Sequence, residues 1–164
     1  IASAMLQEAY GYLETTGMTN WSLAQGDNVQ MPVASDCADV AIEGWSFGHV
    51  MGWYPDTWQE QTDMMLAEME RILKPNGTAI LIETMGTGQR QPKPPSDELA
   101  TLFNYWQAEH GFEYRWIRTD YQCASVDEAD ELTRFFFGDE MEDSIVAGGR
   151  VTLTECTGIW SKTF

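Results

Sequence analysis

Apolar residues recur at helical spacing in several stretches of the chain. These stretches cover residues 2–13, 56–73, 96–106 and 125–136. In each of them the apolar positions follow the 3.6-residue period of an amphipathic helix. Gly17 follows the first stretch, while Asp56, Ser96 and Ser125 precede the others as expected N-terminal caps. We therefore predict a helix in each stretch, with one face against a core.

Short runs typical of strands separate the helical stretches. They cover residues 21–25, 38–43, 78–82, 113–119 and 151–154, with a further piece around 159–160. Residues 78–82 are continuously apolar and rich in β-branched side chains, as in a strand covered on both faces of a parallel sheet. The Lys-Pro-Asn-Gly run 74–77 predicts the end of the preceding helix, because proline cannot continue a helix and Gly77 accepts a left-handed turn.

This alternation of strands and helices predicts a doubly wound α/β sheet. In such sheets the ligand lies outside the carboxyl ends of the strands, so the residues that follow each strand are the ones to inspect. The length of 164 residues and the 43% hydrophobic content are sufficient for one packed domain.

Charge and cysteine content limit the classes of partner. The formal net charge is −17, which disfavours nucleic acid, because binding to phosphates draws on clustered lysine and arginine. No apolar stretch is long enough to span a membrane. The three cysteines are widely spaced, and with only two histidines they suggest no metal site, so we expect reduced thiols and a cytoplasmic location.

Asp27 and Asn28 follow the first predicted strand. A carboxylate there can accept a hydrogen bond from an exocyclic amine such as that of adenine, and the next backbone N–H can donate to a ring nitrogen. An ordinary turn explains the same residues, and on their own they favour the turn.

The turn from Glu43 through Gly44 and Trp45 to His49 carries an acid, an imidazole and aromatic rings. Trp45, with Trp53 and Tyr54 nearby, could face a cationic centre. His49 could act as a general base near neutral pH, although a structural histidine is the simpler interpretation. The turn as a whole favours a ligand wall.

In their order along the chain, these stretches resemble the class I S-adenosylmethionine-dependent methyltransferases. Residues 1–6 resemble the segment that follows the family's second strand, and residues 21–32 resemble its third strand with an adenine-contacting "GD…P" segment. Residues 39–49 are similar to its fourth strand, and residues 68–77 to its "E..R.LKPGG" helix end. Asn76 stands where the last motif has its first glycine. The decamer 68–77, with the strand after it, is the most specific of these features.

The resemblance implies a three-layer, doubly wound Rossmann-like sheet that lacks its first two strands. The family's glycine-rich loop and ribose-binding acid would precede Ile1, so we expect residues 1–164 to be a single, N-terminally truncated domain. Its cofactor-side half would be 1–83 and its variable, substrate-side half 84–164. The resemblance further implies that S-adenosylmethionine contacts Ile1, Asp27, Asn28, Glu43, Gly44 and Trp45.

The implied activity is in-line methyl transfer to a small molecule or a protein. The family has no universal catalytic residue, which leaves His49, Glu43 and Tyr54 as candidates. Because the glycine loop and ribose acid are missing, we expect the chain alone to be inactive. The alternative is a non-catalytic acidic remnant of the fold that binds a basic protein partner. The methyl acceptor and the oligomeric state stay open.

Overall fold

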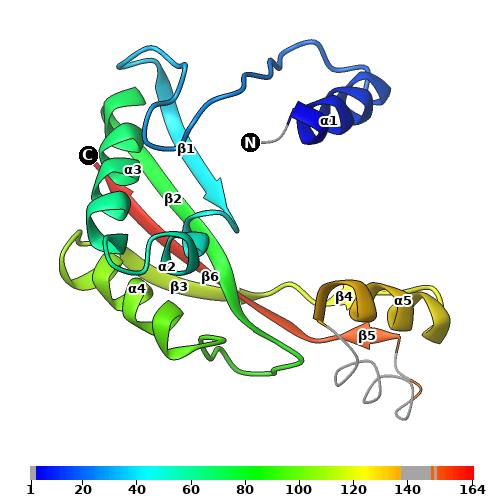
Figure 1. Cartoon of the computed structure of the whole chain (residues 1–164). Coiled ribbons are helices and arrows are strands. Elements are labelled where there is room, and N and C mark those ends of the chain that lie inside the picture. Colours follow the sequence, from blue (N-terminus) through cyan, green and yellow to red (C-terminus); the bar gives the residue numbers. More distant parts are fainter. Residues whose placement is uncertain (1–2, 138–148, 150) are drawn as a thin grey trace. The chain divides into compact units, whose positions relative to one another are not determined.

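The computed structural model describes residues 3–137, 149 and 151–164 (Figure 1). The chain divides into two compact units. The first unit comprises Ile1–Ala41, Tyr54–Ala79 and Thr163–Phe164, and the second comprises Ile42–Trp53 and Ile80–Lys162. Strands β1 (Ala38–Gly44) and β2 (Leu73–Thr87) each contribute residues to both units.

The first unit contains helices α1 (Ser3–Thr15) and α3 (Trp58–Ile72). Both were predicted from their apolar period, and Gly17 follows α1 with a left-handed φ of 67°. In α3 the buried stripe includes Met65, Met69 and Ile72, as the period requires. The predicted cap at Asp56 is wrong: Thr57 precedes the helix and makes no side-chain capping bond.

The Lys-Pro-Asn-Gly run lies inside β2 after α3 has ended at Ile72. The predicted helix end is confirmed, but the predicted role of Gly77 is wrong. Asn76 takes the left-handed conformation with φ of 66°, because its short polar side chain tolerates that region. Gly77 is needed for space, since a Cβ there would lie 2.9 Å from the carbonyl oxygen of Lys74.

The strand predicted for residues 21–25 is not formed. Trp21 instead donates its indole N–H to the carbonyl of Met18 at 2.8 Å and packs edge-on against Tyr10. A strand needs a hydrogen-bonded neighbour, and no described residue pairs with this segment in a ladder. The nearest bridge joins Asp27 to Gln30.

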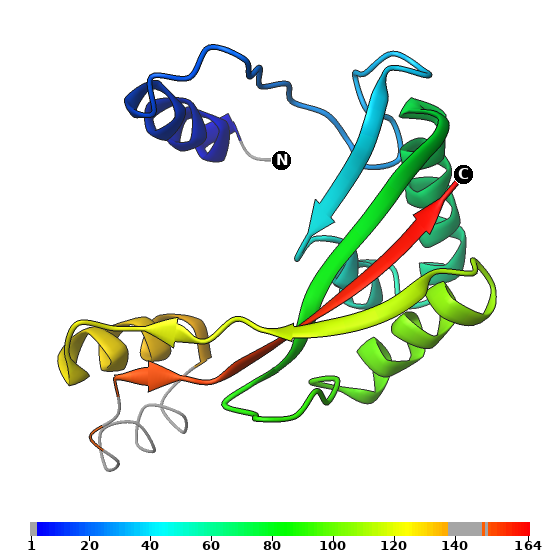
Figure 2. The same cartoon turned by 180° about the vertical axis from the view of Figure 1, so that it is seen from behind.

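The sheet has the hydrogen-bonded order β1-β2-β6-β3, and its strands appear from both sides in Figures 1 and 2. β6 (Glu155–Thr163) pairs antiparallel with β3 (Glu113–Arg118). β2 and β6 also run antiparallel, because Gly77 pairs with Phe164 and Gly88 with Thr154. The sheet is therefore mixed, with β1 and β2 in the same direction (Figure 1).

The core of the second unit forms where α4 (Asp97–Ala108) covers the sheet. Ser96 caps α4 as predicted, by accepting a hydrogen bond from Leu99 N at 3.2 Å. Phe103 and Trp106 of α4 are buried against Trp160 of β6, with ring centroids 4.5 Å and 5.2 Å apart. This packing holds α4 close to the carboxyl ends of β1 and β2.

A smaller element pair completes the second unit. β4 (Tyr121–Gln122) pairs with β5 (Thr152–Leu153), and Leu153 packs with Ala129 of α5 (Val126–Phe137). The predicted cap at Ser125 is present, since Ser125 Oγ accepts from Glu128 N at 3.1 Å. The side chain of Phe136, the last position of the apolar period predicted for 125–136, lies outside the described residues, as does the acidic run of the sequence at 139–143. The mixed α/β class with a partial central sheet agrees with the sequence prediction.

Candidate functional site

Strands β1 and β2 each carry a buried glutamate near the carboxyl end. Glu43 is 6% exposed and Glu83 is 5% exposed. Glu43 Oε1 accepts hydrogen bonds from the backbone N–H groups of Ser46 at 2.6 Å and Phe47 at 2.9 Å. Glu83 Oε1 accepts from the N–H of Gly48 at 2.8 Å. The two carboxylates thus hold the turn that leads from β1 into the short helix η1 (Phe47–His49) and then α2 (Val50–Trp53).

Burial and mutual repulsion favour the protonated forms of these acids. Desolvation raises the pKa of Glu43 despite its bonds to Phe47 and Ser46, and its Oε2 is buried with no hydrogen-bond partner among the described residues. Desolvation and then the charge of Glu43 raise the pKa of Glu83 to about 7. Glu83 can therefore gain or lose a proton near neutral pH.

Gly48 is required by the close approach of the Glu83 carboxylate. A Cβ at this position would lie 2.9 Å from Glu83 Oε1 and 3.2 Å from Cδ2 of Leu99. Any larger residue would push the turn away from β2 and α4. The absence of a side chain at Gly48 therefore permits the buried hydrogen bond from its N–H to Glu83 Oε1.

Trp45 has a left-handed backbone conformation, with φ of 52°. A bulky side chain in this region is an outlier that costs about 1–3 kcal/mol. Its N–H donates to the carbonyl of Ile82 at 2.9 Å, and the Glu43 carboxylate fixes the next two residues. The strain persists because these contacts determine the course of the turn.

A cavity of about 550 Å³ lies beside this turn, within the second unit. It is lined by Trp45, Gly48, His49, Met51, Gly52, Trp53, Glu83, Thr84, Ser96, Glu98 and Leu99. The rings of His49 and Trp53 are stacked, with centroids 4.9 Å apart. This volume falls in the usual range for small-molecule sites.

The predicted site residues are distributed over both units. Trp45 and His49 line the cavity, and Glu43 supports its wall through the turn. Gly44 ends β1 directly before Trp45 and is exposed. Tyr54, which is exposed, does not line the cavity. Ile1 lies outside the described residues.

Sequence reasoning placed Glu83 among the residues to inspect, because it follows the strand predicted for 78–82, but did not choose it as a site residue. The available signal was an acid placed directly after the apolar run 78–82, at the carboxyl end of a buried strand. Its importance depends on burial and on Glu43, which is far from it in sequence. Leu99 and Glu98 of α4 were likewise missed, because helix packing brings them to the cavity.

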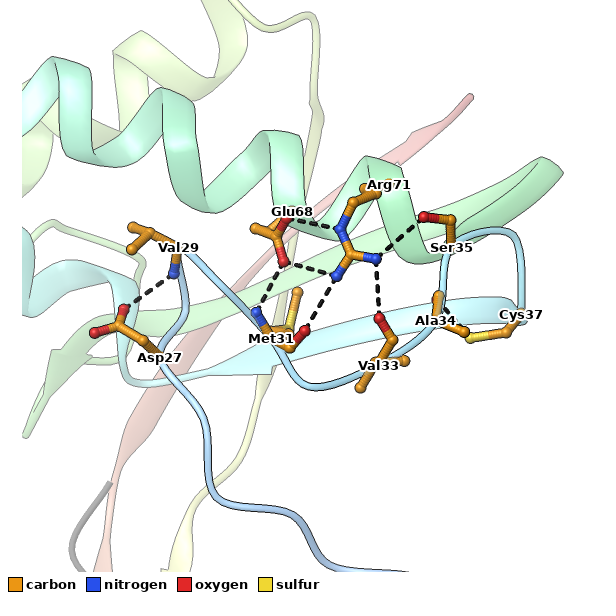
Figure 3. Close-up of polar contacts among 9 residues, drawn as sticks. All are labelled: Asp27, Val29, Met31, Val33, Ala34, Ser35, Cys37, Glu68 and Arg71. Atoms are coloured by element: carbon orange, nitrogen blue, oxygen red, sulfur yellow. Dashed lines mark hydrogen bonds and ion pairs between the residues drawn. The ribbon is translucent and has the colours of Figure 1, made fainter.

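Asp27 and Asn28 lie in the first unit, in a turn shown in Figure 3. Asp27 Oδ1 accepts from the N–H of Val29 at 3.1 Å, and its carbonyl accepts from the N–H of Gln30 at 3.0 Å. This side-chain-to-backbone bond is an Asx turn. The turn interpretation is therefore present in the structure, and it leaves the Asp27 side chain exposed.

The segment after this turn is held by an ion pair on α3 (Figure 3). Arg71 binds Glu68 through Nε at 2.7 Å and Nη2 at 2.8 Å. Arg71 also donates to the carbonyls of Met31 at 3.2 Å and Val33 at 2.9 Å, and to Ser35 Oγ at 3.2 Å.

Glu68 also binds this segment, so the Glu68–Arg71 pair forms a clamp on residues 31–35. Its Oε2 accepts from the N–H of Met31 at 2.8 Å. The hydrogen bond from Arg71, followed by the one from Met31, lowers the pKa of Glu68 to about 2. The "E..R" pair of the decamer 68–77 therefore fixes the backbone of residues 31–35.

Comparison with known proteins identifies the fold. No family model and no curated protein matches the chain. A candidate methyltransferase from Bacillus halodurans C-125 is 17% identical and has a TM-score of 0.55, over 99% of this chain and 80% of that one. A SAM-dependent methyltransferase from Aquifex aeolicus is 12% identical with a TM-score of 0.54, over 98% of this chain and 64% of that one.

The YcgJ protein from Bacillus subtilis is similar to the same degree, at 16% identity and a TM-score of 0.55, over 99% of this chain and 79% of that one. The chain therefore has a Rossmann-like methyltransferase fold with a partial sheet, as the sequence resemblance predicted. In the described part of the chain, no helix combines the length and the apolar character needed to cross a membrane.

We expect Glu83→Gln to flatten the pH dependence of stability. The folded pKa of Glu83 is about 7 against an ordinary 4.5, so the folded state binds more protons between these values. Stability therefore falls as pH rises from about 4.5 to 7, by about 3 kcal/mol for this group. Urea unfolding from pH 4.5 to 8 measures it. The exposed Glu109→Gln should retain the wild-type slope, and an equal slope in the Glu83 variant would contradict the assignment.

Backbone strain at Trp45 predicts that a glycine variant is more stable than an alanine variant at this position. Trp45→Gly should be more stable than Trp45→Ala by about 1 kcal/mol, because only glycine adopts the left-handed region without cost. At Met64, an exposed position in the interior of α3, the order should reverse, with glycine below alanine by about 0.5–1 kcal/mol. Thermal unfolding followed by circular dichroism compares the pairs. The same order at both positions would refute strain at Trp45.

Loss of the Arg71 clamp should loosen residues 31–35 without unfolding the chain. In Arg71→Met we expect hydrogen exchange at the Met31 amide to accelerate by about tenfold, the factor for weakening a bond to a charged group. Amide exchange measured by NMR reports this directly. Protection at Leu81, which lies in the buried part of β2, serves as the internal control and should not change.

Proposed function

We propose that this chain is part of an S-adenosylmethionine-dependent methyltransferase that acts on a small molecule. The cavity at the carboxyl ends of β1 and β2 carries this proposal, because ligands of open α/β sheets bind at that edge. The likeness to solved methyltransferases supports the fold on which the cavity is built. The net charge of −17 favours a small molecule over nucleic acid.

The first unit has features that fit the adenine end of the cofactor. Asp27 uses Oδ1 in the Asx turn, and its exposed side chain leaves Oδ2 available to an exocyclic amine. The Asn28 N–H follows in the same turn. The Glu68–Arg71 clamp keeps the following backbone in one conformation, which lowers the entropy lost on binding. The sequence resemblance separately implies cofactor contacts at Glu43, Gly44 and Trp45 of the second unit.

S-adenosylmethionine supplies an electrophilic methyl group when it is bound. The role of the chain is to align the acceptor and to exclude water, effects worth up to about 7–11 kcal/mol. Glu43 acts in this scheme as a positioning residue, since its Oε1 is occupied by the turn. His49 lines the cavity and can take a proton from an acceptor that must lose one. Tyr54 has no assigned part in this arrangement.

Titration with S-adenosylmethionine tests the proposal. The protein expressed from its full reading frame should bind the cofactor in isothermal titration calorimetry. Asp27→Asn should retain the Asx turn yet lose about 10- to 100-fold in affinity, because an amide nitrogen then faces the adenine amine. Asp56→Ala is the control, since Asp56 caps no helix and lies outside the site. A wild-type protein that does not bind the cofactor would overturn the proposal.

A further inference from the structure

The cavity in the second unit combines acids and aromatic rings without a base of the lysine or arginine type. Glu83 lines it as a carboxylate that is 5% exposed, and Glu98 contributes a second acid from α4. Trp45 and Trp53 supply two indole rings. Among the described residues that form the lining, none is lysine or arginine. Carboxylates with indole faces are the groups that recognise organic cations.

The charged groups around Glu83 do not neutralise it. β1 brings Glu43, η1 brings His49, and α4 brings Glu98. Backbone N–H groups of the turn satisfy one oxygen of each buried glutamate. Two neighbouring buried carboxylates are costly when both are ionised, unless a cation joins them. The described contacts provide no such cation from the chain itself.

We propose that this cavity binds a small protonated amine, with its nitrogen against the Glu83 carboxylate and its substituents against Trp45 and Trp53. The inference rests on the proposed function in that this amine is the methyl acceptor. Glu83 then also acts as proton acceptor: the N–H bond of the ammonium breaks, an O–H bond forms on the carboxylate, and the lone pair stays on nitrogen. An amine freed in this way is a nucleophile.

The pH dependence of binding follows from the state of Glu83. The pKa of this group is about 7, so the carboxylate is mainly ionised at pH 8 and mainly protonated at pH 6. A cationic ligand should therefore bind more weakly at pH 6. His49 also lines the cavity, so a Glu83 variant is needed to assign the effect to Glu83.

Three ligands of similar size but different charge distinguish the effect of ligand charge on binding from the effect of ligand size. Benzylamine is a cation at pH 8, benzyl alcohol is neutral and benzoate is an anion. Calorimetric titration of the full chain at pH 8 should show benzylamine binding on the order of tenfold more tightly than benzyl alcohol, and benzoate not binding. The benzylamine affinity should fall severalfold at pH 6, while that of benzyl alcohol should not change.

Glu83→Gln should remove both the preference for the cation and its pH dependence. Glu109→Gln, at an exposed position beyond α4, should retain both. Trp53→Leu should lower benzylamine affinity severalfold with a smaller effect on benzyl alcohol. Circular dichroism confirms that each variant is folded before titration.

Equal binding of the three ligands would overturn the inference, as would a preference for the cation that survives Glu83→Gln. These titrations contain no S-adenosylmethionine, so they are independent of the cofactor test. Loss of amine selectivity with intact cofactor binding rejects only the amine site. Failure of cofactor binding with intact amine selectivity rejects methyl transfer and leaves the cation site in place.

Discussion

The turn after β1 depends on hydrogen bonds from its backbone to two buried carboxylates. Glu43 and Glu83 together accept the N–H groups of Ser46, Phe47 and Gly48, at distances between 2.6 and 2.9 Å. This arrangement fixes the start of η1 against β2. The left-handed backbone at Trp45 and the cavity wall beside the turn adjoin these same bonds.

Burying these acids costs stability, and the cost explains their chemical properties. A desolvated carboxylate favours its neutral form, and a second acid nearby strengthens that preference. The pKa of Glu83 therefore lies close to neutral pH, where a group can both accept and release protons. Strained backbone and shifted pKa values gather where a protein keeps groups ready for a ligand.

The Glu68–Arg71 pair illustrates the opposite use of a glutamate. Here a guanidinium lies 2.7 Å from the carboxylate, and the pKa of Glu68 falls to about 2 instead of rising. The ionised pair organises the carbonyls and amides of residues 31–35 and is not available for proton transfer. One motif thus holds the backbone of residues 31–35, while the buried glutamates shape the cavity. The difference is the presence of a permanent cation.

The sequence by itself determined the elements whose signals are local. The apolar period and Ser96 predicted α4, and the decamer 68–77 predicted the end of α3 and the strand after it. Residues 21–25 have the residue pattern of a strand but form no ladder with any described residue. Strand pairing depends on which segments lie alongside, and the segment's own sequence does not specify them. Only the tertiary structure decided the role of Glu83, because its burial comes from the surrounding fold and its repulsion from Glu43 on another strand. Desolvation and charge act through space, so their source is invisible along the chain.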